Sequence, residues 1–227
     1  ILRRHLQQGN ELSALPDKVA IQLNDTHPAV SVAELMRLLC DVHGLEFDAA
    51  WDITWRTFSY TNHTLLPEAL ESWPVPLFER LLPRHMQLIY AINAKILRDA
   101  RKSRNFSDRE ISHISLIDER GERRVRMGNL AFMGSHSING VSALHTELMK
   151  ETVFADLHKL YPDRINNKTN GITPRRWLMQ CNPRLTALIR DTVGPDFLDD
   201  AEKLKALDAY ADDAEFQKQF AAVKRAN

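Results

Sequence analysis

The chain has 227 residues, of which 44% are hydrophobic and 26% are charged. This composition is typical of a globular protein with one large domain or two small ones, and it excludes a disordered tail or a collagen-like fibre. The 30 basic and 30 acidic residues give a formal net charge of zero. The charge balance therefore argues against a general nucleic-acid binder and against a polybasic membrane binder.

Cysteine content and hydropathy indicate the compartment. Cys40 and Cys181 are too few for a disulfide framework, so the sequence favours a reducing compartment. No apolar run approaches the roughly 18 residues of a membrane span, and no signal peptide is recognisable, so neither membrane insertion nor secretion is predicted. Both ends fall inside helical patterns, which predicts a piece of a longer protein.

The first predicted element is a short apolar run, Val19 to Leu23, of the kind that is buried in a parallel sheet. Asn24, Asp25 and Thr26 follow it as candidate caps of a helix that has Pro28 in its first turn. The helix ends at Gly44 and carries an apolar stripe, formed by Val32, Leu35, Met36, Leu39 and Val42. These segments predict one strand–turn–helix unit.

A second helix is predicted from Phe47 to Arg56, and a β-rich stretch from Phe58 to His63. The segment LPRHMQLIYAINAKILRDARK predicts a long amphipathic helix with Pro83 near its start. ISLIDERGERRVRM predicts a β-hairpin that turns near Gly121. Its arginines alternate with glutamates, so a solvated hairpin tip is favoured over an anion-binding patch.

NLAFMGSHSING repeats the strand–turn–helix pattern, and VSALHTELMKETVF supplies the helix. NKTNGITPRRW is predicted to be a polar connection, containing Gly and Pro, between two helical regions. From Pro174 onward the pattern is helical, with breaks near Pro183, Gly194 and Pro195. The predicted fold class is α/β, with predominantly parallel strands up to about Asn170 and a mostly helical remainder.

Polar residues collect where the predicted strands end, which is where open α/β sheets bind ligands. Four such places occur, namely Asn24 to His27, Thr61 to Thr64, Ser135 to Ser137 with Asn139, and Asn166 to Thr173. Their amides and imidazoles both donate and accept, which suits a neutral ligand rich in hydroxyl groups. Helix capping and turns explain any one of these places equally well, but four together favour a binding site.

Other chemistries receive less support from the spacing. The nine histidines form no HExxH motif and neither cysteine lies in a CxxC pair, so no metal site is predicted. Asp25 and Glu71 are a candidate carboxylate pair for a glycoside hydrolase, which only their separation can decide. His136 lies between two serines, but GSHSING is not a GxSxG elbow, so a turn is favoured.

The longer motifs carry a family resemblance. KVAIQLNDTHP, YTNHTLLPEALE, LLPRH, GSHSINGVSALH and NKTNGITPRRWL occur in this order, and together they closely resemble the α-glucan phosphorylases, which act on glycogen, maltodextrin or starch. The likeness extends over nearly the whole chain, and the composition favours a bacterial member. The resemblance implies a two-domain glycosyltransferase-type fold with Rossmann-like domains. Residues 1–170 would form the later part of the N-terminal domain and residues 171–227 the helical start of the C-terminal, cofactor-binding domain.

The resemblance also implies roles for individual residues. His63 and Asn170 match the residues that bind the 6-hydroxyl of the glucosyl unit, and Asn139 and Val141 match residues near the sugar and the cofactor. The polar lining where the glucan enters is matched by Asp25, His27 and Glu71, and Trp177 resembles a tryptophan near the cofactor. None of these residues is expected to be a catalytic acid or base.

The resemblance implies a parent enzyme that uses inorganic phosphate and pyridoxal phosphate to release glucose 1-phosphate from α-1,4-glucans. The lysine that anchors the cofactor and the groups that bind phosphate lie elsewhere in the family sequence, so this segment is expected to be inactive alone. The parent is expected to be a cytoplasmic homodimer whose allosteric sites lie mostly outside this region. The alternative from another class is a non-catalytic carbohydrate-binding module.

Overall fold

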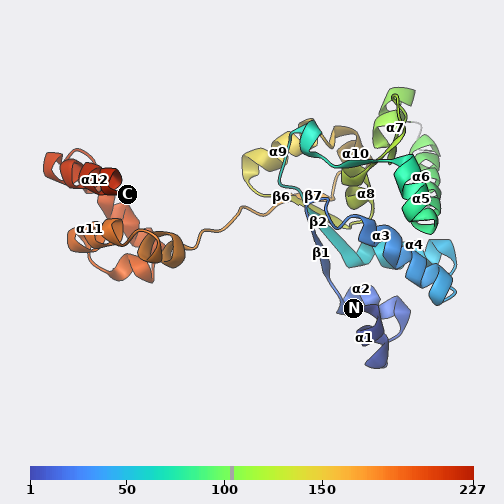
Figure 1. Ribbon diagram of the computed structural model, residues 1–227, viewed down its shortest axis with the longest axis horizontal. Coiled ribbons are helices and arrows are strands. Elements are labelled where there is room, and N and C mark those ends of the chain that lie inside the picture. The colour runs from blue at the N-terminus through green and yellow to red at the C-terminus, as the bar shows by residue number, and fades with distance from the viewer. Residues whose placement is uncertain (103–104) are drawn as a thin grey trace. The chain divides into compact units, whose positions relative to one another are not determined.

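The computed structural model describes residues 1–102 and 105–227. The chain forms two compact units, Ile1–Asn170 and Gly171–Asn227. The strands described below belong to the first unit, and the second unit is helical (Figure 1). Among the described residues, no helix combines the length and the apolar character that crossing a membrane requires.

A parallel sheet organises the first unit, with its strands in the order β1-β2-β6-β7. The strands are β1 (Ile21–Asn24), β2 (Phe58–Thr61), β6 (Ser137–Gly140) and β7 (Ile165–Asn167). Successive side chains of a strand point to opposite faces. Paired positions therefore form an apolar row, Leu23, Tyr60, Ile138 and Ile165, and a polar row, Asn24, Thr61, Asn139 and Asn166. This sheet confirms the predicted α/β class.

The apolar row of the sheet belongs to one buried core that includes helices α3 (Val30–Arg37), α6 (Pro83–Lys102) and α8 (Met127–Met133). Tyr60 packs edge-on against Phe154, with ring centroids 6.1 Å apart, and Phe132 lies 5.4 Å from the same ring. All three rings are buried. The apolar stripe predicted for the long helix is confirmed, because Met86, Ile89, Ile92 and Ile96 are buried. The core thus holds the strands from which the polar residues extend.

A second, antiparallel sheet has the order β3-β5-β4. Strands β4 (Ile117–Asp118) and β5 (Arg124–Arg126) form the predicted hairpin, and Gly121 in its turn has a φ of 83° that favours glycine. Strand β3 (Ser72–Pro74), which the sequence pattern did not predict, pairs with β5. Pro74 at the end of this short strand is consistent with an edge position.

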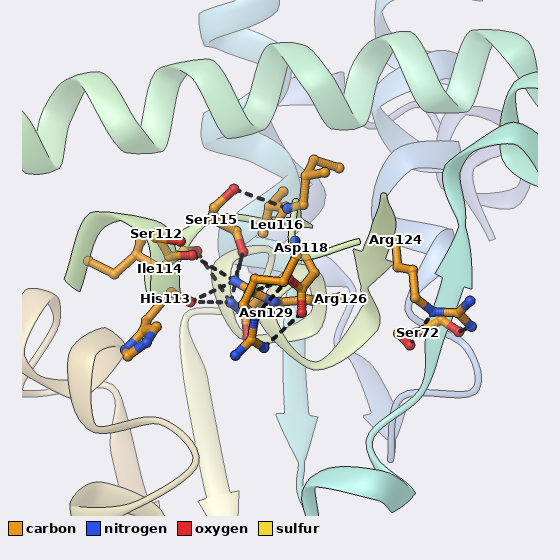
Figure 2. A network of polar contacts seen from close by, with 12 residues as sticks. Ser72, Ser112, His113, Ile114, Ser115, Leu116, Asp118, Arg124, Arg126 and Asn129 are labelled. Carbon is orange, nitrogen blue, oxygen red and sulfur yellow. Dashed lines mark hydrogen bonds and ion pairs between the residues drawn. The ribbon is translucent and has the colours of Figure 1, made fainter. Parts of the chain in front are cut away.

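The tip of the hairpin is solvated as predicted, since Arg120 and Arg123 are exposed, whereas Arg126 at its base is partly buried and bonds to a neighbouring helix end. Arg126 donates to the carbonyl oxygens of Ser112 and Ser115 at 2.7 and 3.1 Å, at the C-terminal end of helix α7 (Asp108–Ile114). The Asn129 amide donates to the carbonyls of His113 to Ser115 (Figure 2). These donors satisfy carbonyl groups that a helix end leaves unpaired. The hydrogen bonds from Arg120 hold the pKa of Asp118 well below its usual range.

Three local predictions were wrong. The helix after β1 begins at Val30, where the described residues show no side-chain cap, because residues 26–29 form a separate turn instead of capping it. NLAFM is not a strand, since residues 127–133 form α8, whose side chains are buried on most sides. Val42 is 59% exposed, because residues 38–42 adopt a wider π-helical turn that rotates it off the apolar stripe.

The remaining helices of the first unit are α1 (Leu2–Gln7), η1 (Leu12–Ala14), α2 (Leu15–Lys18), η2 (Leu38–Val42), α4 (Phe47–Thr57), η3 (Pro67–Ala69), α5 (Val75–Leu81), α9 (Ala143–Glu151) and α10 (Ala155–Leu160). The second unit contains η4 (Arg175–Gln180), α11 (Pro183–Val193), η5 (Asp196–Leu198), η6 (Ala201–Tyr210) and α12 (Ala214–Ala226). Its helical character and the breaks at Pro183 and Gly194 agree with the sequence prediction. The assignment of the two units to parts of two family domains stays a prediction.

Candidate functional site

The carboxyl ends of the parallel strands meet at one edge of the sheet. There β1 ends at Asn24, β2 at Thr61, β6 at Gly140 and β7 at Asn167. Three of the four predicted polar places, those after β1, β2 and β7, therefore lie along this edge. The fourth prediction was partly wrong, because residues 135–137 lead into β6 from its opposite end, and only Asn139 reaches the site edge.

A chain of hydrogen bonds links the strands at this edge. The Gln22 amide donates to the Thr61 hydroxyl at 2.9 Å, and that hydroxyl donates to Oδ1 of Asn139 at 2.8 Å. The Asn139 amide nitrogen in turn donates to the Gly140 carbonyl at 2.9 Å. Asn139 therefore lies at this edge of the sheet, where its amide bonds to Thr61 of the neighbouring strand β2 and to the Gly140 carbonyl of its own strand.

His63 lies on the loop directly after β2, and its side chain is exposed. Nε2 of His63 is 2.9 Å from Oδ1 of Asn24, which is the last residue of the neighbouring strand β1. The preceding residue, Asn62, is completely buried and bonds to the ring of His145 at 2.9 Å. The exposed ring of His63 thus follows directly after the buried side chain of Asn62, whose hydrogen bond fixes the backbone of this loop.

Val141 and Asn170 approach each other beyond β6 and β7. The backbone N–H of Asn170 donates to the Val141 carbonyl at 2.9 Å, and that of Lys168 donates to the Gly140 carbonyl at 3.1 Å. The side chain of Asn170 is exposed, so its amide is accessible to a ligand. Lys168 directs its ammonium to Oδ1 of Asn166 at 2.8 Å. The two backbone bonds extend the β6–β7 pairing and place Asn170 beside the turn after β6.

Asp25, His27 and Glu71 form a second group at the end of β1, which we call the Glu71 cluster together with Thr26. Oε2 of Glu71 accepts a hydrogen bond from the Thr26 hydroxyl at 2.6 Å and lies 3.1 Å from Nδ1 of His27. The Met127 N–H donates to the Glu71 backbone carbonyl at 3.0 Å, which fixes the loop that carries this carboxylate. The structure therefore brings Glu71 into contact with the turn after β1, which carries Asp25 and His27.

Asp25 adopts a backbone conformation that is rare for its residue type. Its φ of 63° is the only positive value for a residue other than glycine among the described residues. One carboxylate oxygen accepts from the Thr26 N–H at 2.7 Å, and the Asp25 N–H donates to the Thr61 carbonyl at 3.0 Å. Strained backbone of this kind concentrates at functional sites, where the surrounding structure holds it in place.

The Glu71 cluster also bears on the hydrolase hypothesis. A glycosidase needs one carboxyl group to protonate the leaving oxygen and a second that acts as nucleophile or base. Here Asp25 holds its own turn, and Glu71 is occupied by Thr26 and His27. Their hydrogen bonds give both carboxylates a role as supports for the loop, and these contacts require no hydrolytic role for either.

Trp177 belongs to the second unit, where it lies in η4 and is 69% exposed. Its uncovered indole can pack against a planar ring. Holding a phosphorylated cofactor also needs cations or free backbone N–H groups. At the strand ends, Lys168 is directed to Asn166, and the other predicted site residues are amides, imidazoles and carboxylates. The predicted site residues at the strand ends therefore supply no anchor for a phosphorylated cofactor.

A metal site and a cavity near α7 are the alternatives to the strand-end site. Among the described residues, no group of three or more histidine, cysteine, aspartate or glutamate side chains is placed to hold a metal ion. A cavity of about 330 Å³ near α7 and β5 is lined by Glu71, by apolar residues and by further charged side chains. These are paired with each other, His113 with Asp156 at 2.8 Å and Arg120 with Asp118 at 2.9 Å. The strand-end site offers more accessible hydrogen-bonding groups.

The sequence matches the family described as carbohydrate phosphorylase over residues 1–227. It is 50% identical, over 99% of this chain and 26% of the relative, to "Glycogen phosphorylase" from Synechocystis sp.. It is 49% identical over 94% of the chain to "Glycogen phosphorylase, muscle form" from Homo sapiens and 48% identical to the muscle form from Oryctolagus cuniculus, covering 25% of each. The chain thus spans about a quarter of the length of the curated relatives it matches.

Proposed function

This chain belongs to the carbohydrate phosphorylase family, and on that premise we propose that the whole protein is an α-glucan phosphorylase. The reaction transfers the terminal glucosyl unit of an α-1,4-glucan to inorganic phosphate. The bond between C1 and the glycosidic oxygen breaks, a bond between C1 and a phosphate oxygen forms, and the departing 4-hydroxyl gains a proton. The products are glucose 1-phosphate and a glucan shortened by one unit.

The observation that carries the proposal is that His63, Val141 and Asn170 follow the carboxyl ends of the adjacent strands β2, β6 and β7, with the backbone of Asn170 bonded to the Val141 carbonyl. His63 after β2 and Asn170 after β7 are both exposed. The free ring nitrogen of His63 can accept from a hydroxyl group, and the Asn170 amide can donate to it and accept from it. We assign His63 and Asn170 to the glucosyl 6-hydroxyl, with Asn139 and Val141 lining the sugar. Positioning of this kind is a large part of catalysis.

The Glu71 cluster is proposed to line the entry of the glucan chain. Asp25 and His27 lie on the turn after β1, where Asp25 accepts from the Thr26 N–H, and the Glu71 carboxylate contacts this turn through Thr26 and His27. Carboxylates accept strongly from sugar hydroxyls, and a preformed turn reduces the entropy lost on binding. These residues are assigned to binding, not to proton transfer.

Pyridoxal phosphate belongs to the proposal as the cofactor of the whole protein, where its phosphate group supplies the proton-transfer chemistry. Trp177 is proposed to contact it, and the anchoring lysine is proposed to lie outside this chain. The chain would then form one wall of the active site and be inactive alone. The whole protein is further proposed to be cytoplasmic, since the free thiols of Cys40 and Cys181 suit a reducing compartment. It is also proposed to be a homodimer.

The test is cleavage of maltoheptaose by the whole protein with and without inorganic phosphate. Glucose 1-phosphate that forms only with phosphate supports the proposal. Glucose or maltose released without phosphate would instead support the hydrolase. Calorimetric binding of maltodextrin without any turnover would support a carbohydrate-binding module.

A further inference from the structure

Asn62 is a buried amide whose hydrogen-bonding groups are occupied. It is 0% exposed, although the histidine next to it is exposed. Its Nδ2 donates to the Tyr60 hydroxyl at 3.0 Å, and its Oδ1 accepts from Nε2 of His145 at 2.9 Å and from the Thr64 N–H at 3.2 Å. A buried polar group that is satisfied in this way has one defined orientation. The loop that carries His63 is therefore held on both sides of that residue.

His145 connects this loop to the next strand. It lies in the first turn of α9, where its backbone N–H donates to the Ser142 hydroxyl at 3.2 Å. A Cβ atom on Gly140 would lie 2.9 Å from Cδ2 of His145, so the ring packs directly on the end of β6. The connection between Gly140 and Ser142 contains Val141, whose carbonyl holds Asn170.

One hydrogen bond and one packing contact of the His145 ring therefore join the segments that carry the proposed sugar ligands. On one side the ring holds Asn62 and thus the His63 loop, and on the other side it packs on the turn that holds Asn170. Burial lowers the pKa of His145, which favours the neutral ring that donates through Nε2 to the amide oxygen. Because Asn62 is buried, this contact acts through the two loops and not on the sugar itself.

We propose that His145 and Asn62 are positioning residues that set the spacing of His63 and Asn170 around the glucosyl 6-hydroxyl. The inference rests on the proposed phosphorylase function. Its physical basis is that small displacements of positioned groups lower the rate strongly, by up to about 100-fold for a shift of about 1 Å. A merely structural role would lower the stability of the protein without preference for any sugar hydroxyl.

The test compares two variants at the same position in the whole protein. His145→Phe keeps a ring but removes the hydrogen-bond donor, whereas His145→Gln keeps an N–H group near the position of Nε2. Activity is measured on two glucosyl donors, maltoheptaose and its analogue that lacks the 6-hydroxyl on the non-reducing unit. We expect His145→Phe to lower kcat/KM by about 10-fold on maltoheptaose, and His145→Gln to restore most of it. On the 6-deoxy donor, both variants should match the wild type.

Two controls complete the experiment. His43→Phe changes a histidine in the loop after η2 and should leave both donors unaffected. Tyr60→Phe removes only the acceptor of the Asn62 amide, so it gives a milder variant with the same donor preference if His145→Phe does not fold. An equal loss of kcat/KM on both glucosyl donors, or no loss on either, would overturn the inference. In that case the proposed function stands, because the wild-type protein is still active. A wild type that forms no glucose 1-phosphate would overturn both.

Discussion

Nε2 of His63 lies 2.9 Å from Oδ1 of Asn24. The last residue of β1 therefore orients the exposed histidine ring that follows β2. A carbonyl oxygen only accepts, which places the ring proton on Nε2 and leaves Nδ1 of the neutral ring as an acceptor. The nitrogen that remains available is therefore suited to accept a hydrogen bond from a sugar hydroxyl.

Replacing Asn24 should affect the reaction through this ring. We expect Asn24→Ala to lower kcat/KM on maltoheptaose by about 5-fold, since one orienting hydrogen bond is worth about 1 kcal/mol. The loss should be smaller than that of His63→Ala. Gln22→Ala is the matched control, because Gln22 lies on the same face of β1 but bonds to Thr61. A loss of equal size in that control would show that only the sheet edge was disturbed.

His63→Ala and Asn170→Ala should each lower kcat/KM for phosphorolysis while the fold stays intact. An unmade buried hydrogen bond costs about 1–3 kcal/mol, or roughly 5- to 150-fold in rate when the bond is made in the transition state. Because both residues are assigned to one hydroxyl, the double variant should lose less than the sum of the two free energies. Additive losses that persist on the 6-deoxy donor would contradict these roles.

Gly140→Ala should destabilise the chain. The added Cβ would lie 2.9 Å from both Cα of Thr146 and Cδ2 of His145, and backbone at that distance cannot easily move. Forcing an atom into a packed site costs about 1–3 kcal/mol, measurable as a lower free energy of unfolding of the 227-residue chain in urea. Gly171→Ala is the control, since nothing lies within 4 Å of its Cβ position. Equal stability of the two variants would refute the close approach.

Protonation of Glu34 should contribute to the decrease in the free energy of unfolding at acidic pH. Hydrogen bonds from Arg37 at 2.8 and 2.9 Å, supported by His85, lower the pKa of Glu34 to about 2 from 4.5. A depressed carboxyl pKa stabilises the fold above the unfolded value, and this stabilisation is lost as the pH falls toward 2. Urea unfolding between pH 5 and pH 2 should therefore show a shallower decline for Glu34→Gln. Parallel curves for both proteins would exclude this contribution.

The 227-residue chain alone should not retain pyridoxal phosphate. The anchoring lysine is assigned to another part of the protein, and Trp177 can contact the cofactor ring but cannot bond to it covalently. After incubation and borohydride reduction, mass spectrometry should find no stable adduct on the chain, whereas the whole protein serves as the positive control. A stoichiometric adduct on one lysine of this chain would contradict the placement of the anchor.

Much of the fold could be predicted because its signals are local. Helix α6 has an apolar stripe and an N-terminal proline, and the hairpin has a glycine at its turn. Helix α8 was misread because seven mostly apolar residues are equally consistent with a buried strand, and only their burial distinguishes the two. Strand β3 was missed because it has only three residues and gains its stability from pairing with β5.

The candidate site was predictable in its residue types but not in its connections. Polar residues after strands were selected correctly at β1, β2 and β7, since parallel strands end at one edge. His145 was missed because it is a single histidine in an amphipathic helix, 83 positions from its partner. Nothing in the sequence indicates that Asn62 is buried while His63 beside it is exposed.

The alternation of rows across the parallel sheet has a consequence for how the site is assembled. A strand that paired one residue out of step would exchange its two faces and bring Asn24, Thr61 or Asn139 into the core in place of Leu23 or Tyr60. Burial of an unpaired amide is costly, so misaligned pairings are strongly disfavoured. Burial of the apolar row thus fixes the register of the strands. The spacing between the polar groups on the other face is therefore set by side chains that do not contact the ligand.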